Sequence, residues 1–453
     1  MDGENYMNKK IIQIMLAILL AFALSGCGKG KAQTGENDKY IELEENKSCC
    51  NDLMVEIESY GEYSVIYFYD YSSKSEVYAC SQANCTHNVE DYQSGKINCN
   101  AIVKGEAKYP FIYNEKLYYI CVDTDDSVLW RSNIDGSEKE KVAKLDKPLI
   151  NIGATFCVYD GKLYIASGVQ EEVEYSENSS SCFIVESEVY EISIDSGKIR
   201  QLTNMGKKPS VSCDMIQCFE GKVYIKYSFN EKTYNEAGFK DAKSYSDWHT
   251  SDDFSMKEDI DRLGKKQNYY VYDLKNNKLD KLDIKFQSTL EEYKGIEDND
   301  CYYIICVKGN KLYYQDPVLA NRTIVSYDFN TKEKKEILNA YSIVYKYIDD
   351  KIYMVSTYMN ENTKDEVIPK ADLNISPKYY IYDLNKEELI EQHYGVDGKI
   401  LYVIDENDEG LLTYEKAFDE NYDFIDEHSF YEIQKNYHHV LRNFHANFFY
   451  FLC

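Results

Sequence analysis

The chain of 453 residues has a net charge of −27, from 51 Lys and Arg against 78 Asp and Glu, and 44% of its residues are hydrophobic. This hydrophobic fraction suffices for a large core, and 45 tyrosines with 18 phenylalanines favour strands over helices. The strong negative charge opposes binding to the phosphate backbone of nucleic acids. We therefore exclude nucleic acid from the expected partners.

The first 27 residues have the features of a bacterial export signal. A pair of lysines at positions 9 and 10 precedes an apolar run from Ile11 to Leu24, which is too short to span a bilayer comfortably. The run ends in Leu-Ser-Gly-Cys at 24–27, which resembles the lipobox of bacterial lipoproteins. The resemblance implies that Cys27 carries a diacylglycerol, so membrane lipid is an expected partner and the outer face of the cell membrane the expected location. The alternatives are an ordinary secreted protein and a short anchor helix.

Residues 28–51 are polar and rich in Gly, Lys, Glu and Asn, without a sustained apolar period. This composition predicts a flexible tether between the membrane and the folded part. The folded part is therefore expected to begin at residue 52.

One short pattern returns repeatedly between residues 52 and 433. Val158–Ile165 reads VYDGKLYI, in which a polar turn separates two runs of aromatic and branched residues, and this arrangement is typical of a tight β-hairpin. Variants of the pattern end at Ile120, Ile225, Tyr314, Val355 and Ile404. Most variants are followed by a strand that ends in an Asp or Asn turn and then by a further short strand, as in VYEISIDSG at Val189–Gly197.

Each unit therefore contains four antiparallel strands, which is the composition of a β-propeller blade. The units start near Leu53, Lys108, Asn151, Val211, Gly295, Ile343 and Val396. We predict an all-β fold with a single β-propeller of seven blades, or of six if the first and last units combine into one. A pair of β-sandwiches and a β-helix are the competing architectures, although β-helix repeats are shorter than these.

One unit contains a polar insertion at residues 228–267. Part of it, Met256–Leu263, has a short helical pattern, and the insertion also holds Trp248 and His249. Insertions into repeats lie in loops on one face, often the binding face, and an exposed aromatic ring stacks well on a sugar. Trp248 and His249 are therefore candidate ligand-binding residues. The alternative is that Trp248 only fastens the insertion to the edge of the sheet.

Residues 434–453 differ in composition from the rest of the chain. The segment lacks the acidic balance found elsewhere and has several aromatic residues close together near its end. A packed terminal element and an aberrant tail are both consistent with this atypical aromatic composition.

Cys80, Cys85, His87 and Cys99 are close in sequence and have the side chains that metal sites and disulfides use. Three thiolates and an imidazole satisfy a tetrahedral Zn²⁺ ion, although the spacing differs from the usual two-residue zinc knuckle. A disulfide between Cys85 and Cys99 is the second alternative and would contribute about 3 kcal/mol. Reduced thiols that only pack are the third. A structural zinc ion is thus the one cofactor that we consider.

The same residues carry a family resemblance. Cys80-Ser81, Cys85, His87 and the Cys-Asn-Ala run at 99–101 resemble a motif of uncharacterised propeller lipoproteins of anaerobic Gram-positive bacteria, which are related to TolB-like and other extracellular propellers. The similarity extends over most of Tyr63 to Glu391. It implies a propeller fold and a Gram-positive source, and it implies no activity.

Other cysteines have positions typical of packing residues. Cys157, Cys218 and Cys306 each precede the repeated polar turn by one to three residues, where a small apolar group is expected to face the neighbouring blade. Without Cys27, thirteen of the fourteen cysteines remain, so at least one thiol has no partner for a disulfide within the chain.

The sequence contains no Gly-x-Ser-x-Gly elbow, Walker loop or His-Glu-x-x-His motif, and we predict no catalytic residue. A binding module for a protein or carbohydrate partner is therefore the preferred function. The alternative is a glycoside hydrolase or lyase with its site in the axial funnel. Two carboxylates at glycosidase separation beside an exposed aromatic ring would favour that enzyme.

Overall fold

The computed structural model describes residues 40–50, 53–70, 75–123, 125–149, 154–176, 179–249, 251, 253–284, 303–316, 321–341, 343–356, 378–392, 401–407, 410–415 and 430–434. Cys27 with the signal region, residues 28–39 of the predicted tether and residues 435–453 of the predicted tail lie outside this part of the chain. Within it the fold is all-β, as predicted, with strands that form antiparallel sheets and a few short helices. Among the described residues, we find no helix whose length and apolar character would allow it to cross a bilayer.

The sheets follow one another in chain order, and we number them from 1 to 7. Four of them are four-stranded antiparallel meanders. Sheet 2 consists of β7 (Glu106–Tyr113), β8 (Lys116–Val122), β9 (Ser127–Asn133) and β10 (Glu140–Leu145). Sheet 4 consists of β15 (Ser210–Phe219), β16 (Lys222–Asn230), β17 (Lys265–Asp273) and β18 (Lys278–Lys281). Sheet 5 consists of β19 (Tyr303–Lys308), β20 (Lys311–Asp316), β21 (Asn321–Asp328) and β22 (Lys334–Tyr341), and sheet 6 of β23 (Ile343–Ile348), β24 (Lys351–Ser356), β25 (Lys378–Asp383) and β26 (Glu388–Gln392).

The other three sheets are variations on this meander. Sheet 1 consists of β2 (Lys47–Cys50), β3 (Leu53–Tyr60), β4 (Tyr63–Asp70) and β5 (Ser75–Tyr78), with β6 (Ile102–Lys104) also paired to β4. Sheet 3 consists of β11 (Phe156–Tyr159), β12 (Lys162–Ser176), β13 (Ser179–Ser193) and β14 (Ile199–Gln201), with β1 (Ile41–Leu43) added beside β11. Sheet 7 consists of β27 (Leu401–Asn407), β28 (Gly410–Glu415) and β29 (Phe430–Gln434) among the described residues.

The predicted hairpin is confirmed at β11 and β12. Tyr159 pairs with Lys162, and the two turn residues Asp160 and Gly161 have φ of 49° and 67°. Two successive positive φ values define the type I′ turn, whose twist matches that of paired strands. The Asp-Gly pair thus determines where the first strand ends and the second begins.

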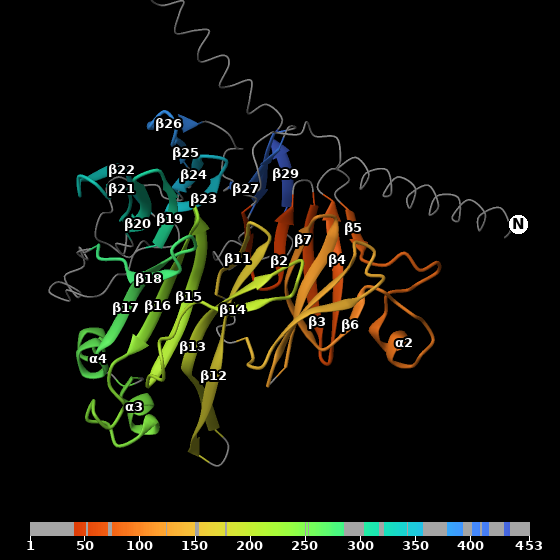
Figure 1. Cartoon of the computed structure of the whole chain (residues 1–453), viewed down its shortest axis with the longest axis horizontal. Coiled ribbons are helices and arrows are strands. Elements are labelled where there is room, and N and C mark those ends of the chain that lie inside the picture. Colours follow the sequence, from red (N-terminus) through yellow and green to blue (C-terminus); the bar gives the residue numbers. More distant parts are fainter. Residues whose placement is uncertain are drawn as a thin grey trace, which may run out of the picture.

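Neighbouring sheets pack through their first strands. β11 contacts β15, β15 contacts β19, β19 contacts β23 and β23 contacts β27. Three apolar clusters extend across sheet boundaries, one over sheets 1 and 2, one over sheets 2, 3 and 4, and one over sheets 4, 5 and 6. Figure 1 shows the sheets following one another through the molecule in the order of the chain. Strands inside these clusters therefore pack against neighbouring sheets, which explains the continuous buried apolar run at residues 163–166 of β12.

The predicted tether is wrong over residues 40–50. β1 pairs with β11, with Ile41 opposite Val158, and β2 pairs with β3. The Leu43 side chain is fully buried. Sequence reasoning missed these strands because they are only three and four residues long and are surrounded by charged residues. The folded part also begins before residue 52, and sheet 1 begins one strand earlier than predicted.

The insertion is shorter than the predicted 228–267. β16 continues to Asn230 and pairs there with Lys265 of β17, so residues 231–264 separate the two strands. The insertion contains α3 (Ala242–His249) and α4 (Met256–Leu263), and the latter confirms the predicted helical segment. Ser255 caps α4 at its start and Gly264, with φ of 62°, ends it, which is the usual pair of helix boundary signals.

Candidate metal centre

The loop that holds Cys80, Cys85, His87 and Cys99 leaves and rejoins one edge of sheet 1. It begins after β5 and ends at β6, and both of these strands pair with β4. The loop contains α2 (Val89–Gln93), where the Asn88 side chain accepts a hydrogen bond from the Asp91 amide at 3.0 Å. The helix and its cap close the long interval between His87 and Cys99, so the two residues meet despite their separation in sequence.

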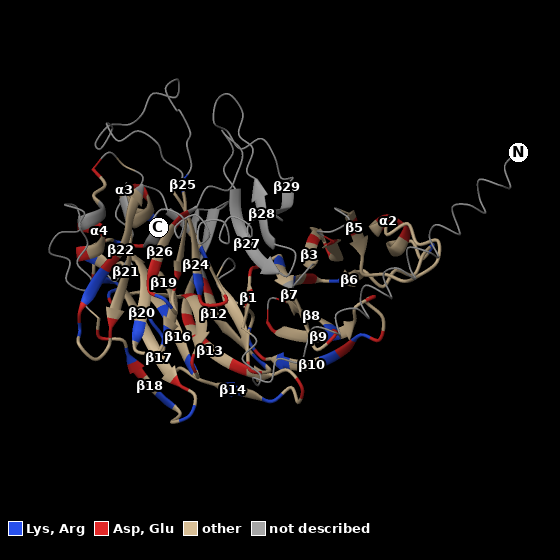
Figure 2. Ribbon diagram, turned by 90° about the horizontal axis from the view of Figure 1, so that it is seen from above, with Lys and Arg blue, Asp and Glu red and all other residues tan. Residues whose placement is uncertain are grey.

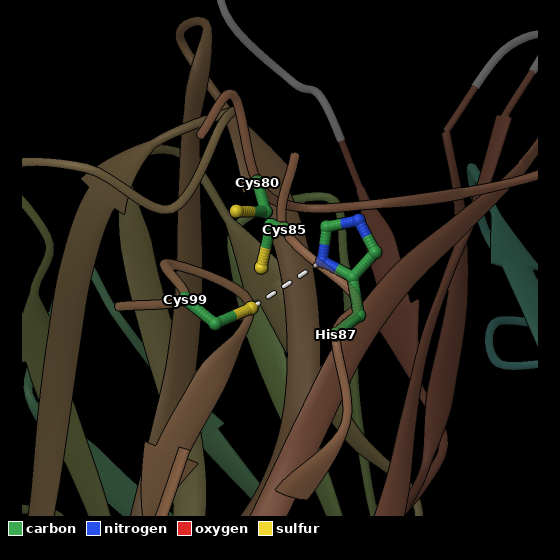
Figure 3. A group of neighbouring side chains, drawn as sticks. All are labelled: Cys80, Cys85, His87 and Cys99. Atoms are coloured by element: carbon green, nitrogen blue, oxygen red, sulfur yellow. Dashed lines mark hydrogen bonds between the residues drawn. The ribbon is translucent and has the colours of Figure 1, made fainter. Parts of the chain in front are cut away.

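The four side chains converge on one point. The Sγ atoms of Cys80, Cys85 and Cys99 and one ring nitrogen of His87 all lie within 4.8 Å of one another. Figure 3 shows the imidazole beside the thiol of Cys99, with 3.4 Å between Nδ1 and Sγ. The His87 ring stacks on Tyr78 with centroids 4.3 Å apart, which restricts its orientation. His87 itself has φ of 56°, in the left-handed region that residues other than glycine seldom adopt.

These distances fit a tetrahedral metal ion. Zn–S bonds of about 2.3 Å and Zn–N bonds of about 2.0 Å place neighbouring ligand atoms roughly 3.5 Å apart. A cluster within 4.8 Å therefore needs only small side-chain movements to close around an ion. The donor set of three thiols and one imidazole is a known structural zinc set, and it leaves no open coordination position.

The protonation of the cluster is uneven. Burial opposes ionisation of Cys80, but backbone amides and the Cys99 thiol outweigh it, so the pKa of Cys80 is lowered. Burial, together with the neighbouring Cys85 and Cys80 thiols, raises the pKa of Cys99 to about 12. Burial lowers the pKa of His87, which keeps the imidazole neutral with a lone pair available. A cation at the centre of the cluster would therefore favour the thiolate form of Cys99.

Sheet 2 supplies a positive charge beside the cluster. Lys139 donates a hydrogen bond to the carbonyl oxygen of Ile102 at 3.0 Å. Burial lowers the pKa of Lys139, and the nearby Cys99, Cys121 and Cys80 act in the opposite direction. A Zn²⁺ ion with three thiolates and a neutral imidazole has a net charge of −1, which Lys139 would balance.

The turn between β9 and β10 presses directly on the loop. Ser81 donates a hydrogen bond to Asp135 at 2.6 Å. The next residue, Gly136, has φ of 68°, and a Cβ atom there would lie 2.6 Å from the Asn100 carbonyl oxygen and closer still to that of Ala79. The residues that flank Cys80 and Cys99 therefore contact sheet 2, so the cluster lies at the junction of sheets 1 and 2.

The sequence analysis left three alternatives for these residues, and the geometry favours the metal site. All four side chains converge on one point, whereas a Cys85–Cys99 disulfide would use only two of them and leave out Cys80 and His87. Packing alone does not require a histidine nitrogen to face three thiols. Lys139 and Gly136 were missed, because Lys139 resembles any lysine of a strand connection and Gly136 resembles any turn glycine until sheets 1 and 2 are placed together.

Trp248 and His249, the candidate ligand-binding residues, lie at the end of α3. The half-buried Trp248 ring contacts Phe239 and Phe254, each at 5.3 Å between centroids, and the Arg262 guanidinium lies 5.1 Å from the same ring. These contacts join α3 to α4 and favour the alternative that Trp248 fastens the insertion. His249 is exposed at the end of the helix, and its ring lies 4.4 Å from that of Phe254.

Fold and cluster together define an all-β protein of consecutive antiparallel meanders with a Cys₃His site between the first two sheets. No family model and no curated protein matches the chain.

Solved structures show distant similarity. The chain is similar to the β-propeller domain of the Trilobed protease from Pyrococcus furiosus, with 12% identity, a TM-score of 0.40 and coverage of 83% of this chain and 92% of that one. It is similar to the acylaminoacyl peptidase of Pyrococcus horikoshii, with 12% identity, a TM-score of 0.45 and coverage of 89% and 54%, so it spans about half of that enzyme. It is also similar to TolB from Acinetobacter baumannii, with 11% identity, a TM-score of 0.30 and coverage of 84% of this chain and 81% of TolB. Similarities this distant carry no argument about activity.

Proposed function

We propose that the protein is a seven-bladed β-propeller, anchored through Cys27 to the outer face of the cell membrane, that binds a protein or glycan partner. Seven consecutive sheets among the described residues and the contacts between their first strands support a ring of blades. The lipobox-like tetrad at 24–27 supports the lipid anchor and a Gram-positive source.

The position of β1 is our main reason for proposing a binding protein rather than an enzyme. β1 lies beside the first strand of sheet 3, and Lys346 of sheet 6 forms an ion pair with Glu42 at 3.1 Å. Tyr40, just before β1, stacks on Phe219 of sheet 4 at 5.7 Å between centroids. The start of the folded chain therefore occupies the space among the first strands, where a propeller enzyme would place its funnel.

Ion pairs near β1 hold the N-terminal segment, residues 40–46, against the first strands of other sheets. Glu42 raises the pKa of Lys346 well above its usual range, more than burial opposes it. Lys108 of β7 forms ion pairs with Glu106 at 2.9 Å and with Glu45, which lies between β1 and β2. The carboxylates of Glu42 and Glu45 hold the N-terminal segment to lysines of the first strands, which is a structural use rather than that of a glycosidase pair.

We also assign Zn²⁺ to Cys80, Cys85, His87 and Cys99, where it would hold sheets 1 and 2 together. The closed donor set suits a structural ion and leaves no position for a substrate. Figure 2 shows acidic and basic residues interspersed along strands such as β10 and β18, a pattern that does not favour nucleic acid as the partner.

The test of the proposed function uses the full-length protein in detergent. Purified cell-wall sacculi and a panel of immobilised glycans serve as probes, and reducing ends are measured in the same samples. Saturable binding without release of reducing ends supports a binding module. Continuous release that depends on the protein would show an enzyme and overturn the proposal.

The anchor and the metal are tested separately. Cys27→Ser should move the protein from the detergent phase to the aqueous phase after phase partition, and an unchanged distribution would contradict the lipid anchor.

Elemental analysis should find about one zinc ion per chain. The His87→Ala variant should lose this zinc, and the Cys306→Ser variant should retain it.

A further inference from the structure

Two cysteines outside the metal cluster meet across the junction of sheets 3 and 4. Cys157 lies on β11 and Cys218 on β15, 61 residues further along the chain, and their Sγ atoms are 3.5 Å apart. Both side chains are buried, with exposed fractions of 0% and 1%. The two sulfur atoms are in van der Waals contact, and a disulfide would shorten their separation to about 2.05 Å.

The backbone beside the pair is held by hydrogen bonding between the two strands. Thr155 pairs with Met215 in a parallel bridge, and the Ile216 amide donates to the Thr155 carbonyl at 2.9 Å. Strands bridged in this way lie about 4.8 Å apart, which is within the range of Cα separations that disulfides span. Cys157 follows this bridge by two residues and Cys218 by three, so the backbone needs little movement to allow the bond.

The environment of the pair suits a structural bond rather than a catalytic one. Burial, followed by the contact with Cys157, raises the pKa of Cys218 well above its usual range, so the folded protein does not present a reactive thiolate here. A bond formed while the chain folds would afterwards be shielded from reductants by the surrounding core.

We infer that Cys157 and Cys218 form a disulfide that joins sheets 3 and 4 in the exported protein. In this step the two thiols lose two protons and two electrons, and one S–S bond forms. The oxidant is a disulfide of the surroundings, protein or small molecule, which is reduced to two thiols. The inference rests on the proposed export of the chain but not on zinc or on the proposed partner, and it concerns residues that sequence analysis assigned to packing.

The experiment equilibrates the full-length protein, with zinc present, in buffers with different ratios of oxidised to reduced dithiothreitol. A second set of samples is unfolded in denaturant and refolded in the same buffers, so that burial does not limit access. Free thiols are then alkylated under denaturing conditions and the peptides are mapped by mass spectrometry. We expect a linked peptide that contains Cys157 and Cys218 in the oxidising buffers, at least in the refolded samples.

Two variants make the result specific. Cys157→Ser should abolish the linked peptide, and Cys306→Ser, at the corresponding position on β19, should retain it. The oxidised wild type should melt higher than the reduced protein by on the order of 5 °C, a shift that Cys157→Ser should lose. Alkylation of both Cys157 and Cys218 in every buffer would overturn the inference, and so would a bond from either one to Cys213, another buried cysteine of β15. The peptide map of the wild type shows whether Cys157 and Cys218 are linked, even if a variant fails to fold.

Discussion

The junction of sheets 1 and 2 and the junction of sheets 3 and 4 both contain facing cysteines, yet they are held differently. At the first, a long loop on the edge of sheet 1 brings three thiols and an imidazole together against a turn of sheet 2. At the second, two first strands are bridged directly through their backbones and pack two thiols inside a large apolar cluster.

The difference shows what each junction needs. The loop of sheet 1 packs only partly buried side chains such as Val89, Tyr92 and Ile97 against the core, and its short helix α2 has no buried residue, so the proposed zinc ligands would add to its cohesion. The strands at the junction of sheets 3 and 4 bury aliphatic and aromatic side chains, each of which contributes about 1.5–3 kcal/mol, so they are stable without a ligand. Four predictions test or refine this comparison.

The largest effect is expected at the metal cluster. Cys99→Ala should abolish zinc binding and lower the free energy of unfolding by on the order of 5 kcal/mol, because structural zinc contributes about 10–16 kcal/mol in small zinc domains. In the reduced protein, where the inferred disulfide is absent, Cys218→Ala leaves only a small cavity and should cost about 1–2 kcal/mol. Denaturant unfolding of the two variants measures both values. Equal losses would show that the first junction does not depend on a metal.

The next effect concerns the turn that supports the cluster. Gly136→Ala should cost about 3 kcal/mol, because the added Cβ strains a positive φ and meets the backbone of Ala79 and Asn100. The matched control is Gly61→Ala, where φ is 65° and nothing lies within 4 Å of the added atom, so only the strain of about 1 kcal/mol applies. Gly136→Ala should also weaken zinc retention during dialysis against a chelator. Identical behaviour of the two variants would contradict close contact between the loop and sheet 2.

A smaller effect is expected at β1, which is attached to distant sheets by charge. Glu42→Gln removes the ion pair with Lys346, in which both side chains are about one-third exposed, and should cost about 1 kcal/mol. Hydrogen exchange should become faster at Ile41 to Leu43. Glu44→Gln is the control, because its pair with Lys47 is more exposed and 3.7 Å long. Unchanged exchange in Glu42→Gln would mean that strand pairing alone holds β1.

The smallest effect is expected where sheets 5 and 6 are joined by the ion pair of Lys308 and Asp350 at 2.6 Å. Burial opposes ionisation of Asp350, but Lys308, Asn385 and Tyr347 outweigh it and lower its pKa. A lowered folded-state pKa stabilises the fold above the unfolded pKa of about 3.9, and this contribution is lost as the pH falls through the folded value. Asp350→Asn should therefore be less stable than the wild type by about 0.5–1 kcal/mol at pH 7.

The difference between Asp350→Asn and the wild type should shrink as the pH falls below 4. Urea unfolding of both proteins at several pH values measures this difference. A difference that stays constant down to pH 2 would indicate a packing effect rather than a charge effect.

A feature could be predicted from the sequence when the residues that determine it lie close together in the chain. The Asp160–Gly161 turn and α4 were predicted because their signals lie within a few residues. β1 was assigned to a tether because three residues give too short a pattern to distinguish a strand from a polar linker. Trp248 was a candidate for ligand binding because its contacts with Phe239 and Arg262 form only after α3 and α4 pack together.

The sequence by itself determined an all-β chain of repeated hairpins and a group of cysteines with a histidine, because turn residues and alternating apolar runs act locally. Only the tertiary structure decided that four of these side chains converge, that Lys139 and Gly136 of the next sheet complete their surroundings, and that Cys157 meets Cys218. Such contacts join segments far apart in the chain. They depend on how the faces of neighbouring sheets pack, and no pattern within one segment contains that information.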